Sequence, residues 1–148
     1  MIYSYARGDF RISTDPGLLD VALIHAYLSQ ESYWAAEIPL AVVENAIRYS
    51  LNFGLYHESR QIGFARVITD QATFAYLADV FVLTPFRGRG LSKWMMSCIL
   101  ECPSLQGLRR FMLMTKDAQG LYAQFGFGPL KDAAKAMEKT RPDCYKKK

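Results

Sequence analysis

The chain has 148 residues, of which 51% are hydrophobic, 22% charged and 14% aromatic. This length suits one domain, because two halves would each be too small for a generous core, and the composition excludes disordered, collagen-like and coiled-coil proteins. No apolar run approaches the roughly 20 residues that cross a bilayer, and the first residues lack a signal-peptide pattern. We therefore expect a cytoplasmic protein without a membrane partner.

The net charge of +4 is unevenly distributed along the chain. Residues 1–74 hold five basic and eight acidic residues, whereas residues 75–148 hold thirteen and six. This asymmetry fits an anionic ligand in the second half and a cationic one in the first, but also a mixed surface with a solvated basic tail at 141–148. We expect no nucleic-acid partner, because the sequence lacks a basic helix, a finger pattern and a basic and aromatic stripe.

The first elements are a strand and a helix. Residues 11–14 predict a short strand. Asp15 followed by Pro16 predicts a helix start with Asp15 as the N-cap, and apolar residues at helical spacing continue the helix to about residue 29.

A second helix and a hairpin follow. The link after the first helix carries Tyr33 and Trp34, and apolar residues at helical spacing after Pro39 predict the second helix. The β-rich runs 50–56 and 61–68 are joined by a short polar link, which predicts a hairpin.

Residues 73–83 are almost continuously apolar, as expected of a central strand covered on both faces. Asp79 is the one charged residue of this run. Since side chains alternate along a strand, Tyr76 is predicted on the face opposite Asp79.

A glycine-rich turn with the sequence RGRG, residues 87–90, follows this strand and precedes a predicted helix at 91–101. The order strand, glycine turn, helix is that of a phosphate-binding site, because helix N-termini attract anions with bare N–H groups. Arg87 and Arg89 add charge there. Spacing excludes the nucleotide P-loop and the dinucleotide turn. A turn that uses glycine only for its backbone freedom is the structural alternative.

The rest of the chain continues the α/β pattern. Residues 109–114 predict a strand that the helix before it places parallel to 73–83. Residues 118–125 predict a last helix, with Gly126 in the C′ position. Beyond residue 128 the pattern predicts one more strand around 136–139 and then the tail.

Cysteine and histidine placement argues against a metal centre. Cys98, Cys102 and Cys144 are an odd number without a CxxC, and both histidines lie far from them in sequence, so we expect no metal. Cys98 and Cys102 are interpreted as buried packing residues, with a reactive thiol as the alternative.

A second motif identifies a family. Residues 121–127 have the form LYxxxGF, about 31 residues after the RGRG turn. With both motifs in order, nearly the whole chain resembles the GCN5-related N-acetyltransferase (GNAT) family. The resemblance implies an α/β acyl-CoA N-acyltransferase fold, with a mixed central sheet flanked by helices in one domain over 1–148. It also implies an enzyme that transfers acetyl from acetyl-CoA to a primary amine.

The resemblance also implies a coenzyme site. Residues 87–92 match the family's pyrophosphate turn R-x-x-G-x-[GA], except that serine stands last. Val82 matches the strand residue whose backbone pairs with the pantetheine arm. Thr115 stands where many members have asparagine, so the resemblance implies no side-chain amide contact at this position. The implied coenzyme contacts are Phe81, Val82, Leu83, Arg87, Gly88, Arg89, Gly90, Leu91 and Ser92.

The reaction sets two proton tasks. Direct attack of an amine on a thioester needs no covalent enzyme intermediate, which fits the lack of a nucleophile and base pair. An amine with a pKa of about 10 must lose a proton, and the thiolate must be stabilised. By resemblance Tyr122 donates to the thiolate, and a core aromatic is the alternative. Asp79 is the candidate for the first task, either as a base that acts through water or as a group that binds the acceptor's ammonium. The alternative is a structural role, in an ion pair or as the cap of a bulge. Glu37 and Glu44 are less well placed.

The acceptor side is the least defined. Tyr33 and Trp34 match a segment that often walls the acceptor pocket in the family, so the predicted substrate contacts are Tyr33, Trp34 and Asp79; simple anchoring of the loop is the alternative. The acceptor is expected to be a small-molecule or peptide amine, and a homodimer stays open as the oligomeric state. A non-catalytic CoA-binding sensor and transfer of another acyl group are the alternative functions.

Overall fold

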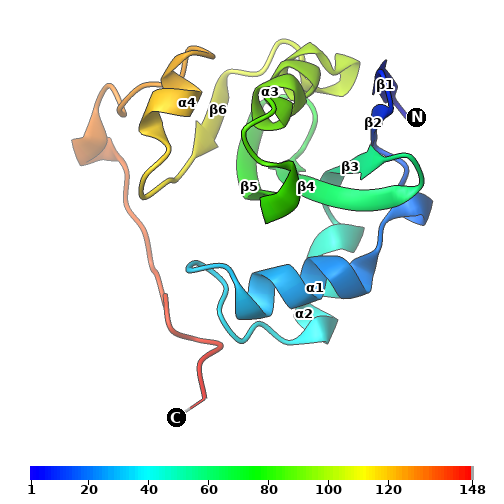
Figure 1. Cartoon of the computed structure of the whole chain (residues 1–148). Helices are drawn as coiled ribbons and strands as arrows, with labels where there is room; N and C mark the ends of the chain where they lie inside the picture. The colour runs from blue at the N-terminus through cyan, green and yellow to red at the C-terminus, as the bar shows by residue number, and fades with distance from the viewer. Residues whose placement is uncertain (148) are drawn as a thin grey trace.

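The computed structural model describes residues 1–147 and is built on one six-stranded sheet (Figure 1). Adjacent strands are antiparallel except the last two, which are parallel and joined by α3 (Leu91–Glu101), as the sequence predicts. The strands lie in chain order across the sheet: β1 (Ser4–Arg7), β2 (Phe10–Ser13), β3 (Leu51–His57), β4 (Arg60–Thr69), β5 (Phe74–Val82) and β6 (Arg110–Leu113).

Helices cover both faces of the sheet (Figure 1). On one face α1 (Val21–Gln30) and α2 (Leu40–Arg48) pack against Phe64 and Phe81. On the other, α3 and α4 (Gln119–Ala123) pack against a second apolar cluster of sheet residues. Burial on both faces explains why the β4 and β5 sequences are apolar almost throughout.

The predicted start of the first helix at Asp15 is wrong. Asp15 caps a short 3₁₀ turn, Pro16–Leu18, and α1 begins only after Asp20. The Asp20 carboxylate accepts the Leu23 N–H at 3.0 Å, and the Asp20 N–H donates to the Gln61 side chain at 2.7 Å. The chain therefore has two successive N-caps, Asp15 and Asp20. Because Asp20 is also held by Gln61 of β4, the α-helix begins after Asp20.

Two other predictions near the chain ends fail. Strand β1 is not predicted, because most of its residues are exposed and it lacks an apolar alternation. The strand predicted at 136–139 is wrong: residues 128–147 contain only a 3₁₀ turn, Ala133–Lys135. Met137 is 96% exposed among charged neighbours, so this stretch has no apolar face to bury. The last helix is also shorter than predicted, and Lys148 of the predicted tail lies outside the described residues.

Strand β5 carries an irregularity at Asp79. Phe81 pairs with Phe64, but Ala78 pairs with Arg66, so β5 has one residue more than β4 between these pairs. Asp79 has a φ of 55°, in the left-handed region that non-glycine residues rarely occupy. The feature is a β-bulge, which sharpens the local twist of the strand.

The bulge has two consequences. Pairing between β5 and β6 ends at Leu77, just before it. The alternation of side chains is also interrupted, so that Tyr76 and Asp79 line the same cavity. The prediction that they face opposite sides is therefore wrong.

Among residues 1–147, no helix is long and apolar enough to cross a membrane.

Gly63, on β4 opposite Val82, leaves no room for a side chain. An added Cβ would lie 2.8 Å from the Phe81 carbonyl oxygen, which is backbone of the next strand and cannot move aside. We expect Gly63→Ala to lower the free energy of unfolding by about 2 kcal/mol, measured by urea unfolding. Gly120→Ala is the control, because nothing lies within 4 Å of the added methyl. Equal midpoints for the two variants would contradict this packing.

Candidate functional site

The edge of β5 is open beyond Leu77. Strand β6 pairs with β5 only from Phe74 to Leu77, so the second half of β5 has no strand on that edge. The Leu83 N–H donates to the Ile62 carbonyl on the β4 side at 2.8 Å. Because backbone groups alternate in direction along an antiparallel ladder, the N–H and carbonyl of Val82 point the other way, into the gap.

The turn after β5 is braced by Arg87. Its Nε donates to the Val82 carbonyl at 2.8 Å, and its Nη2 donates to the Tyr27 hydroxyl at 2.9 Å. Tyr27 in turn stacks on Phe81, with ring centroids 4.0 Å apart. The guanidinium therefore ties the turn to α1 and to the end of β5. The Val82 N–H is left as the donor that faces the gap.

The glycines of the turn adopt backbone conformations that favour glycine. Gly88 and Gly90 have φ values of 79° and 75°, and Gly90 is the N-cap of α3. The first N–H groups of α3, from Leu91 onward, have no intrahelical acceptor. Arg89 is exposed, with its guanidinium 5.4 Å from the centre of the Phe86 ring. The turn thus presents N–H groups and a cation to an anionic ligand.

The residues predicted to contact the coenzyme lie together at the end of β5, in the glycine turn and at the start of α3. Their structural roles differ. Phe81 and Leu91 are buried, so their side chains serve packing. The Leu83 N–H already donates a hydrogen bond to Ile62, and Ser92 lies in the first turn of α3. The structure therefore leaves backbone groups, more than side chains, facing a ligand here.

Tyr122, on α4, is buried and packs edge-on against Phe127, with ring centroids 6.2 Å apart. Burial raises the pKa of its phenol above the ordinary value, and nearby Tyr33 adds to the shift. The Tyr33 hydroxyl accepts the Lys116 N–H at 3.0 Å, which joins the α1–α2 link to the segment before α4. Tyr33 and Trp34 contact each other edge to face.

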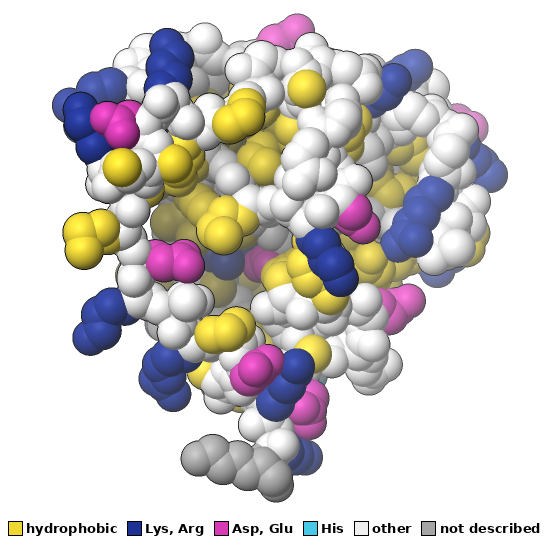
Figure 2. Space-filling model, turned by 90° about the vertical axis from the view of Figure 1, so that its left-hand side faces the viewer, with side chains coloured by type: hydrophobic (Ala, Val, Ile, Leu, Met, Phe, Trp, Pro, Cys, Tyr) yellow, Lys and Arg dark blue, Asp and Glu magenta, His cyan; other side chains and the backbone are white. Residues whose placement is uncertain are grey.

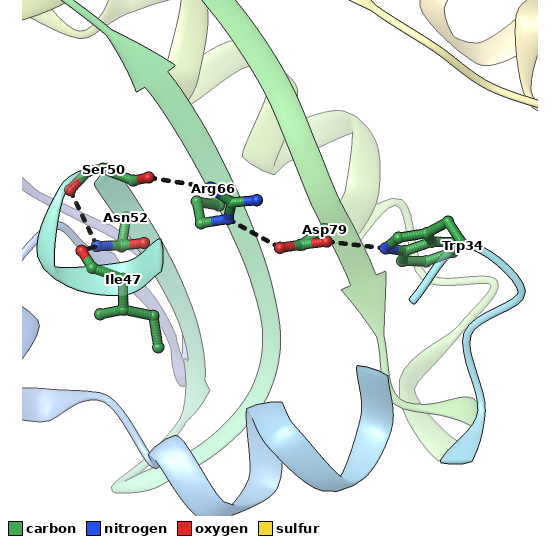
Figure 3. A network of polar contacts seen from close by, with 6 residues as sticks. All are labelled: Trp34, Ile47, Ser50, Asn52, Arg66 and Asp79. Carbon is green, nitrogen blue, oxygen red and sulfur yellow. Dashed lines mark hydrogen bonds and ion pairs between the residues drawn. The ribbon is translucent and has the colours of Figure 1, made fainter. Parts of the chain in front are cut away.

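Asp79 is the centre of a polar network (Figure 3). One carboxylate oxygen accepts the Trp34 Nε1–H at 2.8 Å, and the other accepts Arg66 Nε–H, also at 2.8 Å. The side chains of Arg66 and Asp79 are 16% and 10% exposed. Arg66 Nη1 continues the network to the Ser50 hydroxyl at 3.1 Å. The network joins the α1–α2 link, β5, β4 and Ser50, the residue before β3.

A cavity of about 290 Å³ lies between α1, α2 and the sheet, beside this network. Trp34, Arg66, Tyr76 and Asp79 line it together with aliphatic side chains of both helices. The face shown in Figure 2 is hollowed, with apolar side chains gathered inside the hollow. Glu37, one of the weaker acidic candidates, instead accepts the Lys147 N–H at 3.3 Å. Neither Glu37 nor Glu44 lines the cavity.

Residues 49–129 match the family model described as the acetyltransferase (GNAT) domain. The chain belongs to the GNAT acetyltransferase family. It is 38% identical to a Gibberella zeae protein assigned as an acetyltransferase, over 82% of this chain and 80% of that one. A crystal structure from Xanthomonas campestris pv. campestris, assigned to the GNAT family, is 52% identical with a TM-score of 0.93 over 96% of this chain and 100% of that one.

A more distant structure shares the GNAT fold. The protein is from Clostridium acetobutylicum, is assigned as an acetyltransferase and was determined with acetyl-CoA. It is 12% identical to this chain, with a TM-score of 0.64 over 95% of this chain and 96% of that one.

Sequence reasoning did not identify Arg66 in this GNAT domain. The available signal was its position as the single charge inside the apolar run 61–68, where an unpaired guanidinium would be costly. The buried cysteines agree with their interpretation as packing residues, because Cys98 and Cys102 both belong to the apolar cluster between α3 and the sheet. Burial raises the pKa of the Cys98 thiol to about 11. A thiol with that pKa stays protonated at neutral pH and is a poor nucleophile.

The ion pair on β4 and β5 gives a stability prediction. Arg66→Gln leaves the Asp79 carboxylate without its cation in a largely buried position, so we expect the free energy of unfolding to fall by about 2 kcal/mol. Urea unfolding measures this. Arg60→Gln, at the exposed start of β4, is the control and should unfold like the wild type. If Arg66→Gln were equally stable, the ion pair would not hold the bulge.

Proposed function

We propose that this GNAT protein transfers an acetyl group from acetyl-CoA to a primary amine within a ternary complex. The observation that carries the proposal is the open edge of β5, which leads directly into the glycine turn and the N-terminus of α3. An extended amide-containing arm fits the edge beside the Val82 N–H, and a pyrophosphate fits the turn. The acetyl-CoA bound to the Clostridium acetobutylicum protein of the same fold supports this choice of donor.

The chemistry needs few side chains. The neutral amine attacks the thioester carbonyl carbon, the C–S bond breaks, and the CoA thiolate leaves. The attacking nitrogen loses one proton, and the sulfur gains one. We assign the proton that the sulfur gains to the Tyr122 hydroxyl, which its raised pKa keeps protonated. Water returns a proton to the phenolate before the next turnover.

We assign Asp79 a positioning role in this reaction. Both of its oxygens accept hydrogen bonds, from Trp34 and Arg66, and this fixes the carboxylate in the cavity wall. Its contacts hold the bulge and the aromatic link in place. Water takes the proton that the attacking nitrogen loses. The three cysteines are unpaired thiols, and we propose the reducing cytoplasm as the place of the reaction.

Removing the Tyr122 hydroxyl tests the proton donor. We expect Tyr122→Phe to lower kcat more than about tenfold, because the thiolate loses its donor, while the affinity for acetyl-CoA changes less than about twofold. Release of the CoA thiol in the presence of a panel of amines measures the rate. The acetyl-CoA dependence of the unfolding midpoint measures the affinity.

Tyr49→Phe is the matched control, because Tyr49 is 73% exposed and should tolerate the change. Wild-type turnover by Tyr122→Phe would remove the donor role. If the wild type released no thiol with any amine, yet acetyl-CoA raised its unfolding midpoint, a CoA-binding sensor would replace the enzyme.

The raised pKa of Tyr122 also sets the pH dependence. A donor whose pKa lies above its ordinary value of about 10 stays protonated through the weakly alkaline range, whereas the acceptor amine loses its proton as the pH rises toward about 10. We therefore expect kcat/KM to rise steadily from about pH 7 to about pH 9.5, without a descending limb. A pH–rate profile that falls within this range would contradict the assignment.

A further inference from the structure

The cavity beside Asp79 has an apolar wall. Aliphatic side chains of α1, of α2 and of the link between them line it, including Ile24, Leu28, Ile38, Val43 and Ile47. Its volume of about 290 Å³ corresponds to about ten water molecules in the liquid. A wall of this kind stabilises a compact hydrocarbon group, because each methylene that leaves water makes the free energy of binding more favourable.

The charges at the cavity are matched to each other. Within the described part of the chain, its charged lining residues are Arg66 and Asp79, and these form an ion pair at 2.8 Å. A ligand with one reacting amine places that nitrogen at the thioester. A ligand with a second ammonium would have to bury it beside a carboxylate already paired with arginine, which is unfavourable.

The C-terminal segment contributes one residue, Tyr145, to the wall of the cavity. After α4 the chain runs apart from the sheet and returns to the side of α1 and α2 (Figure 1). Tyr145 then lines the cavity and packs against the apolar cluster of these helices. The contact of the Lys147 N–H with the Glu37 carboxylate holds the segment beside the α1–α2 link. A tail in this position takes space that an approaching polypeptide would need.

We infer that the acceptor is a small primary amine on a compact apolar body, and that Tyr145 forms the outer wall of its pocket. The inference rests on the proposed function and narrows it to one substrate class. A polyamine would bring a second cation into the cavity, and a protein lysine would bring the polypeptide to which it is attached. Neither therefore fits the cavity as well as a small apolar amine.

A matched series of amines tests the substrate class. CoA release is measured with 3-methylbutylamine, with 1,4-diaminobutane and with a short lysine-containing peptide. We expect kcat/KM for 3-methylbutylamine to exceed both others by at least about tenfold. Comparable or higher values for the diamine or the peptide would overturn the inference while leaving the proposed acetyl transfer intact. No release with any amine and no rise of the unfolding midpoint with acetyl-CoA would overturn both.

A variant pair tests the tail. Tyr145→Ala should raise KM for 3-methylbutylamine at least about fivefold, because the outer wall is lost, while KM for acetyl-CoA stays within about twofold. Tyr49→Ala removes an exposed tyrosine outside the cavity and should change neither constant. Thermal unfolding checks that both variants are folded. An unchanged amine KM in folded Tyr145→Ala would show that Tyr145 does not bound the acceptor pocket.

Discussion

The left-handed backbone at Asp79, held by the ion pair with Arg66, is the constraint on which both halves of the site depend. A non-glycine residue with a φ of 55° is costly by itself and persists only where its surroundings hold it. Here the carboxylate accepts hydrogen bonds from Arg66 and Trp34, so the bulge is tied to β4 and to the α1–α2 link. Pairing with β6 ends before the bulge, and the side chains of Tyr76 and Asp79 reach one cavity.

Strand β5 therefore serves the two proposed ligands with different parts of its structure. Its open edge offers the Val82 N–H to the donor, and one face contributes Asp79 to the cavity proposed for the acceptor. Hydrogen bonds hold the segments next to β5 in place. Arg87 ties the glycine turn to α1, and Tyr33 ties the α1–α2 link to the segment before α4. These contacts arrange the site before any ligand binds, which lowers the cost of ordering it.

The sequence predicted those parts of the molecule that follow from local patterns. Strands β3 to β5, helix α3 and the glycine turn are recognisable because apolar spacing and glycine have direct backbone meanings. The bulge is not, since alternation contains no mark for a left-handed aspartate. Arg66 was not identified because its pairing with Asp79 depends on the register of β4 and β5 around the bulge. Tyr145 was not identified because it packs against helices that are distant in the chain. The strand predicted at 136–139 failed because its charged, exposed residues have nothing to pack against.

Amide hydrogen exchange at Val82, with and without acetyl-CoA, tests whether the open edge of β5 binds the donor. We predict slower exchange at the Val82 amide and at the first amides of α3 when acetyl-CoA is present. The Leu83 amide, already bonded to Ile62, should change little, and ATP should not slow exchange at Val82. Saturation with acetyl-CoA that leaves Val82 exchange unchanged would show that the donor binds elsewhere.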